Sequence, residues 1–343
     1  MKRRVAGNVG AALARALTIG LAASLGYAIA VYHPFFRSSV MSRAKIIWDC
    51  LIVAYWVLPF PFYLLIFDLK PRKRFDTGSK PLQMLALLRR IAAKRKKPEV
   101  RVFGSFHARL SMLSLLVKIY YLPIMTTFLV DHYMFFANWF SKSVSIADLT
   151  AGDWLTGIGY RLLFQSIFVL DTAIFSFGYA VELPALRSRI RSVEPTLLGW
   201  AVTLSCYPPL NVATDIVLGR AYSKTVLSFW LAAGSNVIII SCFLVYVWAS
   251  VALLFKASNL THRGIVVHGP YRYIRHPAYA AKNLAWWFEW LPSLTNPANL
   301  VSMIGWNAIY ILRAITEERH LGKDPVYREY CRKVKYRFIP GLI

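Results

Sequence analysis

Long apolar runs separated by short polar segments make up most of this 343-residue chain. A helix needs roughly 20 mostly apolar residues to cross the hydrocarbon of a bilayer. By this criterion the pattern predicts eight membrane-spanning helices, at residues 11–32, 46–67, 112–139, 160–183, 197–218, 225–255, 278–294 and 300–315. The predicted fold class is therefore an all-α integral membrane protein with several membrane spans.

Several of these spans are irregular. Pro208 and Pro209 interrupt the span at 197–218, so we expect a broken or re-entrant helix there. The last two spans are short, and residues 295–299 predict a tight helical hairpin between them. The first span, with its basic start, also resembles a secretory signal peptide. Spanning or cleaved, it leaves the predicted orientation of the other spans unchanged.

Basic residues are concentrated in alternate loops. The chain has 41 Lys and Arg against 16 Asp and Glu, a net charge of +25, which alone would suggest nucleic-acid binding. Segment 68–110, however, holds thirteen basic and three acidic residues, whereas 141–159 holds one base. Because cytoplasmic loops of membrane proteins are rich in Lys and Arg, segments 68–110, 256–277 and the tail from 316 should be cytoplasmic, with both termini. We therefore expect no nucleic-acid partner.

Composition supports the same class. Apolar residues make up 57% of the chain and charged residues only 17%, against about 25% in soluble proteins. The four cysteines are far apart, and neither they nor the histidines have the spacing of metal ligands. These features exclude a disordered chain and a disulfide scaffold, and they predict no metal site.

A second possible membrane contact lies in the first basic loop. Within residues 81–97, leucines and an isoleucine recur at helical spacing and a basic run follows. This pattern is typical of an amphipathic helix that binds anionic lipid headgroups. The alternative is a solvated basic loop that only sets topology, and the sequence does not separate the two.

The stretch 263–279 combines Arg, His and Tyr densely in a short connector. Gly264 and Gly269 permit turns in which the backbone approaches a ligand closely. Pro277 suits the first position of a helix, which places His276 at that helix's N-terminus. The plainer interpretation is a membrane-surface cluster of Arg and Tyr anchors.

Another polar cluster, 313–321, ends the last predicted span. Arg313 and Glu317 are four residues apart and so share one helix face, where an ordinary ion pair is the simple interpretation. Ionisable groups near the hydrocarbon are usually functional. The predicted hairpin brings this cluster beside His276 and Tyr279, so we expect both clusters to share one pocket.

Together the motifs Gly269-Pro-Tyr-Arg-Tyr-Ile-Arg-His-Pro-Ala-Tyr279 and Arg313…Glu317-Glu318…Tyr327-Arg-Glu-Tyr330 resemble the isoprenylcysteine carboxyl methyltransferase superfamily, which includes phospholipid methyltransferases and distant sterol reductases. The resemblance covers roughly the last 85 residues. It divides the chain into a transmembrane region, 1–255, and a cofactor-binding region, 256–343, whose hairpin closes the pocket.

The resemblance implies that S-adenosylmethionine binds in a pocket facing the cytoplasm. By position, the implied cofactor contacts are Arg263, Gly264, Ile265, Val266, Tyr271, His276, Pro277, Tyr279 and Glu317. Arg313 matches the arginine that holds the reacting group of the substrate, so Arg313 and Glu317 are the expected catalytic residues. A guanidinium grips a carboxylate in a fixed fork, and an ionised carboxylate needs no general base.

The expected reaction is methyl transfer to a membrane lipid or lipid-linked acceptor, with an isoprenylcysteine-type carboxylate favoured. An amine acceptor would instead need His276 or Glu317 as a base. One alternative is an NADPH-dependent reductase of an unsaturated lipid or sterol, in which Arg272, Arg275 and Arg319 would contact the extra phosphate. Another is a lipid-binding scaffold without enzyme activity. We expect the region around Glu194 and Cys206-Tyr-Pro-Pro to shape the acceptor site.

Overall fold

A computed structural model describes residues 2–34, 41–57, 89, 106–141, 146, 149–182, 186–221 and 226–342. Apart from residue 89, the amphipathic helix predicted at 81–97 lies outside these residues, as does most of the basic loop 68–110. The described chain is mostly helical, which agrees with the predicted class. It divides into two compact units, Met1–Pro123 and Ile124–Ile343, and each is described by itself.

The first unit contains a pair of helices, α1 (Lys2–Tyr32) and α3 (Met41–Val57). Gly20 lets them approach closely, since a Cβ there would lie 2.7 Å from the Trp56 ring. The Trp56 indole donates to Ser24 Oγ (3.1 Å), and the Tyr27 hydroxyl donates to the Asp49 carboxylate. These contacts join the first two predicted spans. Asp49, a polar residue within a predicted span, serves here as a helix-to-helix partner.

Helix α6 (Phe106–Phe140) begins in the first unit and continues into the second. The further helices of the second unit are α7 (Ala151–Thr156), α8 (Ile158–Ala180), α9 (Leu197–Leu204), α10 (Leu210–Val217), α11 (Phe229–Leu253), α12 (Pro277–Glu289), α13 (Pro297–Leu321) and α14 (Pro325–Lys333). Short 3₁₀ turns occur at η3 (Leu254–Lys256), η4 (Gly269–Arg272) and η5 (Leu291–Ser293).

Within the described residues, four helices are long and apolar enough to cross a membrane: Arg109–Phe140, Ile158–Ala180, Phe229–Lys256 and Pro297–Leu321. These match four predicted spans and support a multi-pass membrane protein. The other four predicted spans are not confirmed. The segment predicted at 278–294 forms α12, which has 13 residues and is too short to cross the hydrocarbon.

The span predicted at 197–218 is interrupted, as its prolines indicated. Helix α9 ends at Leu204 and α10 begins at Leu210, directly after the two prolines. Each proline lacks an N–H and its ring obstructs the preceding turn, and the two in succession interrupt the helix here. The break leaves Tyr207 in a turn rather than on a helix face, and this residue reaches the cavity described below.

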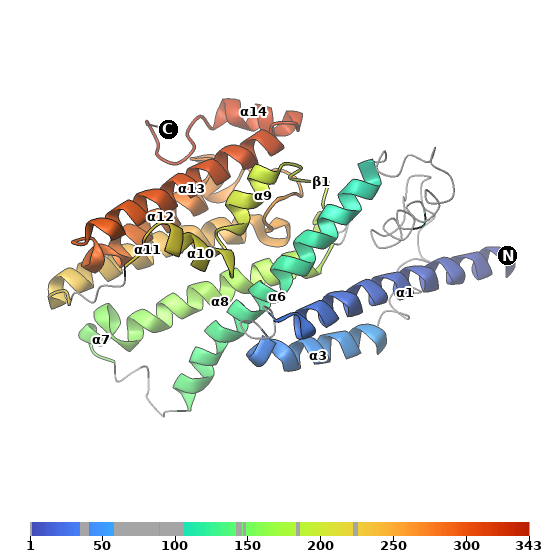
Figure 1. Cartoon of the computed structure of the whole chain (residues 1–343), viewed down its shortest axis with the longest axis horizontal. Coiled ribbons are helices and arrows are strands. Elements are labelled where there is room, and N and C mark those ends of the chain that lie inside the picture. The colour runs from blue at the N-terminus through green and yellow to red at the C-terminus, as the bar shows by residue number, and fades with distance from the viewer. Residues whose placement is uncertain are drawn as a thin grey trace. The chain divides into compact units, whose positions relative to one another are not determined.

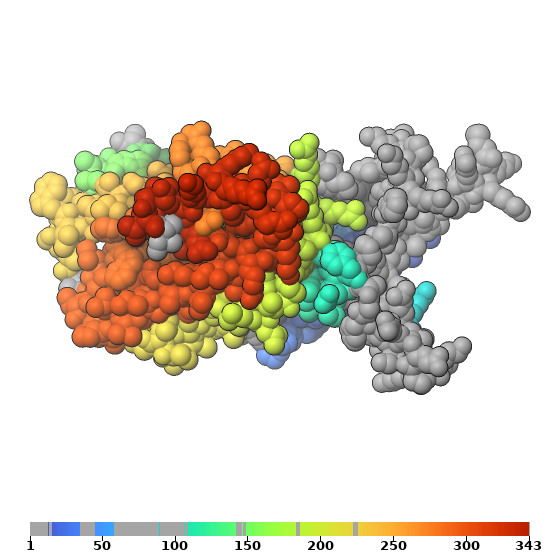
Figure 2. All heavy atoms as spheres, turned by 90° about the horizontal axis from the view of Figure 1, so that it is seen from above, coloured from blue at the N-terminus to red at the C-terminus, as the bar shows by residue number. Residues whose placement is uncertain are grey.

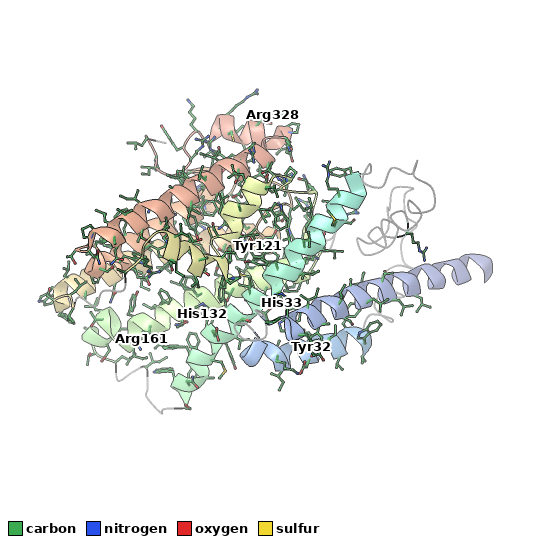
Figure 3. The ribbon with its side chains drawn as sticks, viewed as in Figure 1. Tyr32, His33, Tyr121, His132, Arg161 and Arg328 are labelled. Carbon is green, nitrogen blue, oxygen red and sulfur yellow. The ribbon has the colours of Figure 1, made fainter. Side chains whose placement is uncertain are left out.

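Helices α8, α11 and α12 pack around an aromatic core in the second unit (Figure 1). Phe168 and Phe243 meet edge to face with ring centroids 5.0 Å apart. Ala281 and Ala285 on α12 are buried against this core, and their small side chains let α12 approach α11 closely. Helix α6 also contacts α8: Nδ1 of His132 lies 2.5 Å from Oε1 of Gln165, and the His132 ring stacks on Phe168 (Figure 3).

Two very short antiparallel strands, β1 (Ser192–Val193) and β2 (Thr261–His262), connect distant parts of the chain. Ser192 is opposite His262, and the Arg191 N–H donates to the His262 carbonyl (2.8 Å). This ladder ties the segment after α8 to the loop after α11. The loop thereby acquires a fixed position beside the hairpin of α12 and α13.

The C-terminal helix α14 covers part of that loop. Tyr327, Tyr330 and Val334 pack against Ile265 and Tyr271. The Tyr330 hydroxyl donates to the Tyr271 carbonyl (2.6 Å). The Arg328 guanidinium, labelled in Figure 3, donates to the carbonyl of Gly322 (3.0 Å) at the end of α13. Figure 2 shows the red C-terminal residues covering one face of this unit.

Candidate functional site

A large cavity lies in the second unit between α8, α11, α12, α13, α14 and the 258–266 loop. Its volume is about 1100 Å³, including the part open to solvent. Of the predicted site residues, those that line it are Arg263, Gly264, Ile265, Val266, Tyr271, His276, Tyr279, Arg313 and Glu317. The structure therefore brings together two clusters that are separated by the hairpin in sequence. Their roles toward a ligand stay predictions.

The hairpin joins the two clusters by cross-contacts along its length. His276 Nε2 lies 3.2 Å from Glu318 Oε1, and the Tyr279 hydroxyl donates to Glu317 Oε2 at 2.8 Å. Further toward the hairpin turn, the Tyr279 and Tyr310 rings meet edge to face at 5.5 Å. This order confirms the predicted juxtaposition. The same contacts distinguish two ends of the cavity. Glu317 lies at the loop end, and Tyr310 lies at the deep end.

Arg313 is 5% exposed and lies in the inner wall. Its Nη2 donates to Asn259 Oδ1 at 2.5 Å. Its guanidinium lies 5.0 Å from the centroid of the Tyr279 ring and 5.7 Å from those of Tyr207 and Tyr310. The simple i,i+4 ion pair with Glu317 does not form, and no carboxylate of the described residues lies within 4.0 Å of this guanidinium. A buried cation held only by amide and aromatic groups favours an anionic ligand.

Lys282, one turn along α12 from Tyr279, is a second cation of the inner wall. Its ammonium lies 5.1 Å from the Trp286 ring centroid and 5.6 Å from that of Tyr246. In the described part of the chain it has no carboxylate within 4.0 Å. Buried Asp171 accepts hydrogen bonds from Tyr246 (2.8 Å) and Ser250 (2.5 Å) instead. Arg313 and Lys282 are thus two cations of the inner wall, and Asp171 and Glu289 act on Lys282 only from beyond ion-pair distance.

Glu318 holds the loop end of the hairpin. Its carboxylate lies 3.0 Å from Arg275 Nε and 2.8 Å from Arg337 Nε, in addition to the contact with His276. The His276 N–H donates to the Arg337 carbonyl at 2.9 Å. The His276 ring stacks on Tyr279, with centroids 5.3 Å apart. Arg275 and His276 are thus fixed by an acid that the sequence analysis did not assign.

The 263–266 loop presents backbone to the cavity. Gly264 has φ +109°, a conformation that other residues rarely adopt. Arg263 is buried, and its guanidinium donates to the Ser188 carbonyl (2.8 Å) and Ser258 Oγ (2.8 Å). Its side chain therefore holds the loop in place. Any contact of Arg263 with a cofactor would therefore come from the atoms of this residue that face the cavity and are not used in these two hydrogen bonds.

Pro277 is the predicted contact that the structure does not place at the cavity. It is fully buried at the first position of α12, with His276 as the N-cap residue. Proline is favoured there because its fixed φ suits a helix start and its missing N–H leaves no donor unpaired. Its place in the motif is explained by this helix start.

Two buried groups near the loop have shifted pKa values. Burial lowers the pKa of His262, although Nε2 lies 3.3 Å from the Asp324 carboxylate, which acts in the opposite direction. Burial also raises the pKa of the Tyr271 hydroxyl. His262 is therefore favoured in its neutral form in the folded protein.

Sequence reasoning missed several lining residues. Asn259, Lys282 and Tyr310 belong to no motif that we recognised. Tyr310 lies one turn before Arg313 on α13, whereas Asn259 of the 258–266 loop and Lys282 of α12 come near Arg313 only in the tertiary structure. Tyr207 lies in the Cys206-Tyr-Pro-Pro segment, which we expected to shape the acceptor site. Glu194 lines a smaller adjoining cavity, where Oε2 lies 3.2 Å from His320 Nδ1.

Across the residues that the structure describes, no group of three or more His, Cys, Asp or Glu side chains could hold a metal ion. The chemistry available at the cavity comes from five Lys and Arg residues, the carboxylate of Glu317 and several tyrosines. These groups can bind and orient charged ligands.

Residues 209–334 match the model of a family described as "Protein of unknown function (DUF1295)". That family is associated with membrane proteins similar to steroid 5-alpha reductases and phospholipid methyltransferases. No curated protein matches the chain. The matched region contains α11, the loop after it, the α12–α13 hairpin and α14, and so most of the cavity wall.

Proposed function

We propose that this chain is an integral membrane methyltransferase that uses S-adenosylmethionine to methylate an anionic group on a lipid or lipid-linked acceptor. The observation that supports this most directly is the arrangement on α13. Arg313, a cation with no acidic partner among the described residues, and the carboxylate Glu317 face one cavity a helical turn apart. Tyr279 contacts both of them: its hydroxyl donates to Glu317 and its ring faces the Arg313 guanidinium.

The residues of the loop end fit the cofactor. Glu317 accepts a hydrogen bond from Tyr279 through Oε2, and Oε1 is available to accept ribose hydroxyls. The ring of Tyr271 lines the same part of the cavity. Aromatic faces hold adenine by stacking and sulfonium by cation–π attraction. When bound, S-adenosylmethionine supplies a methyl group on a sulfur that is its own leaving group.

The deep end fits the acceptor. Arg313 and Lys282 attract an anionic oxygen and orient it, while Tyr207, Tyr246 and Tyr310 exclude water from it. Orientation alone supplies a large part of the rate in such a transfer. An ionised oxygen needs no base, which is consistent with His276 being held by Glu318 and with Glu317 being held by Tyr279. Carboxylate O-methylation is therefore favoured over N-methylation.

The reductase alternative receives less support from the same contacts. Two arginines expected to bind the extra phosphate of NADPH have other partners. Arg275 Nε lies 3.0 Å from Glu318 Oε1, and Arg319 Nη2 lies 2.7 Å from Thr196 Oγ1 and 3.5 Å from Glu194 Oε1. Arg272 lies over the Tyr273 ring at 4.6 Å. We also propose that the cavity faces the cytoplasm, where the cofactor is made, in keeping with the positive charge of 256–277.

The test is transfer of radiolabelled methyl from S-adenosylmethionine into lipid extracted from membranes that contain the full chain. Release of labelled methanol by alkali identifies a methyl ester, whereas N-methyl label resists alkali. Arg313→Ala should reduce labelling by roughly 100-fold or more, as removal of a charge-stabilising group at a reacting centre does. The matched control is Arg161→Ala, at the exposed start of α8 (Figure 3), which should label like wild type.

Equal labelling in wild type and the Arg313 variant would refute the proposal. So would calorimetry in which the purified protein binds NADPH and not S-adenosylhomocysteine. Binding of neither, together with salt-sensitive recruitment to anionic vesicles, would favour the scaffold alternative.

A further inference from the structure

Two cationic side chains converge on one glycine at the edge of the cavity. A Cβ built on Gly264 would lie 3.4 Å from Arg191 Nη2 and 3.6 Å from Lys256 Nζ. Gly264 has φ +109°, so its backbone turns in a way that other residues rarely adopt. The space that a side chain would fill is thus open, and it is bordered by a guanidinium and an ammonium.

Separate parts of the fold bring these two cations together. Arg191 precedes β1, and its N–H donates to the His262 carbonyl of β2 at 2.8 Å. Lys256 is the last residue of η3, directly after α11. Both are therefore attached to the elements that fix the 258–266 loop. Their convergence follows from the β1–β2 ladder, and it does not come from one flexible surface segment.

The local acids do not balance this charge. Arg191 Nη1 lies 3.8 Å from Asp324 Oδ2, and the same oxygen lies 3.3 Å from His262 Nε2. Lys256 has no carboxylate within 4.0 Å among the residues with described positions, and the oxygen nearest its ammonium in a hydrogen bond is the Ile265 carbonyl at 3.5 Å. Arg187 lies close enough to add to the positive potential at Lys256. Like charges held together repel, and an anion placed between them relieves the repulsion.

We infer that Arg191 and Lys256, with the open backbone at Gly264, form a binding subsite for the anionic end of the soluble cofactor. Lys256 and Gly264 line the same cavity as Glu317 and Tyr271, which lie at its loop end. The inference rests on the proposed function, so the oxyanion is the α-carboxylate of the amino-acid part of S-adenosylmethionine. A guanidinium and an ammonium together bind an oxyanion by charge-assisted hydrogen bonds.

The test compares two ligands that differ only at this end. S-adenosylhomocysteine carries the α-carboxylate, whereas 5′-methylthioadenosine has the same nucleoside and thioether and lacks the amino-acid part. Calorimetry on the purified full chain should show that Lys256→Gln and Arg191→Gln each weaken binding of S-adenosylhomocysteine roughly tenfold, the effect of losing one charge-assisted hydrogen bond. Binding of 5′-methylthioadenosine should not change.

The matched control is Arg189→Gln, which removes the same charge from an exposed residue two positions before Arg191. It should leave both affinities as in wild type. Lys256→Arg should keep most of the preference for S-adenosylhomocysteine, because it keeps the charge.

Equal weakening of both ligands, or of neither, would overturn the subsite. Failure of the proposed function gives a different pattern, in which wild type binds neither thioether ligand and binds NADPH. If Lys256→Gln then weakens NADPH and leaves NADH unchanged, these side chains hold a phosphate, and the carboxylate assignment is wrong.

Discussion

Gly178, two residues before the end of α8, is where this helix touches the loop that carries the site. A Cβ at position 178 would lie 2.1 Å from the carbonyl oxygen of Ala257 and 3.3 Å from its carbonyl carbon. Carbon–oxygen contacts in proteins begin at roughly 3.3 Å, so Gly178→Ala requires α8 and the loop to separate by about 1.2 Å. The two atoms that the new Cβ would approach belong to the Ala257 backbone, so no side chain can rotate to make room.

The expected cost follows from two opposing effects. Overpacking of a dense interior destabilises by roughly 1–3 kcal/mol, and a backbone overlap of this size belongs at the upper end. Replacing a helical glycine with alanine gains back roughly 1 kcal/mol. The net loss should be about 2 kcal/mol, which lowers the midpoint of thermal unfolding by roughly 4–8 °C for a unit of this size.

The displacement should also reach the site. The Asn259 N–H donates to the Tyr179 hydroxyl at 2.7 Å, and Asn259 Oδ1 accepts from Arg313. Moving the loop away from α8 therefore disturbs the partner that holds Arg313. Gly178→Ala should reduce the activity measured at 20 °C, well below the unfolding midpoint, as well as the stability.

The assay is thermal unfolding of the detergent-solubilised chain, followed by tryptophan fluorescence at one fixed heating rate. The matched control is Gly234→Ala in α11, where a Cβ would meet nothing within 4 Å. That variant should be as stable as wild type or slightly more stable. If Gly178→Ala also unfolds at or above the wild-type temperature, the inferred contact between α8 and the loop is wrong.

Three further predictions concern the site and its supports. Burial, reinforced by nearby Arg191, lowers the pKa of His262 below its ordinary 6.5, so the folded state favours the neutral ring. Stability should be full above about pH 6.5 and should fall as the pH drops toward the lowered pKa, and thermal unfolding of His262→Gln should show less of this pH dependence. Tyr330→Phe removes the 2.6 Å hydrogen bond to the Tyr271 carbonyl and should lower the free energy of unfolding by about 1 kcal/mol, measured by denaturant titration; an unchanged value would contradict that contact. Tyr279→Phe keeps the ring beside His276 and Arg313 but loses the hydroxyl bond to Glu317, so calorimetry should show S-adenosylhomocysteine binding weakened roughly fivefold, and unchanged binding would argue against Glu317 as a cofactor contact.

The sequence was sufficient for the features that depend on local pattern. Apolar runs of adequate length predicted the four helices that could span a membrane. Pro208 and Pro209 predicted the interruption between α9 and α10, whereas α13 begins at Pro297, inside the turn predicted at 295–299. Helix length was less predictable: the apolar run at 278–294 forms only the 13-residue α12, because η5 and the turn residues beside it occupy the last five positions of the run.

Motif spacing also predicted part of the site. A tight hairpin necessarily brings His276 and Tyr279 near the residues around Glu317, and the structure has these contacts. The pairing within the cluster was not predictable. Arg313 and Glu317 have the spacing of an ion pair, yet Glu317 accepts from Tyr279 and Arg313 donates to Asn259, since both partners come from other segments.

By itself, then, the sequence determined a helical membrane protein, the place of its breaks and the pairing of two polar motifs, because each depends on apolar length, proline or short-range spacing. Tertiary structure alone decided which charges have partners. Asn259, Lys282 and Tyr207 come to the cavity wall beside Arg313 from distant segments, and Arg191 meets Lys256 only through the β1–β2 ladder. Electrostatic environment depends on every neighbour within a few ångströms, and for these residues those neighbours lie far away in the chain.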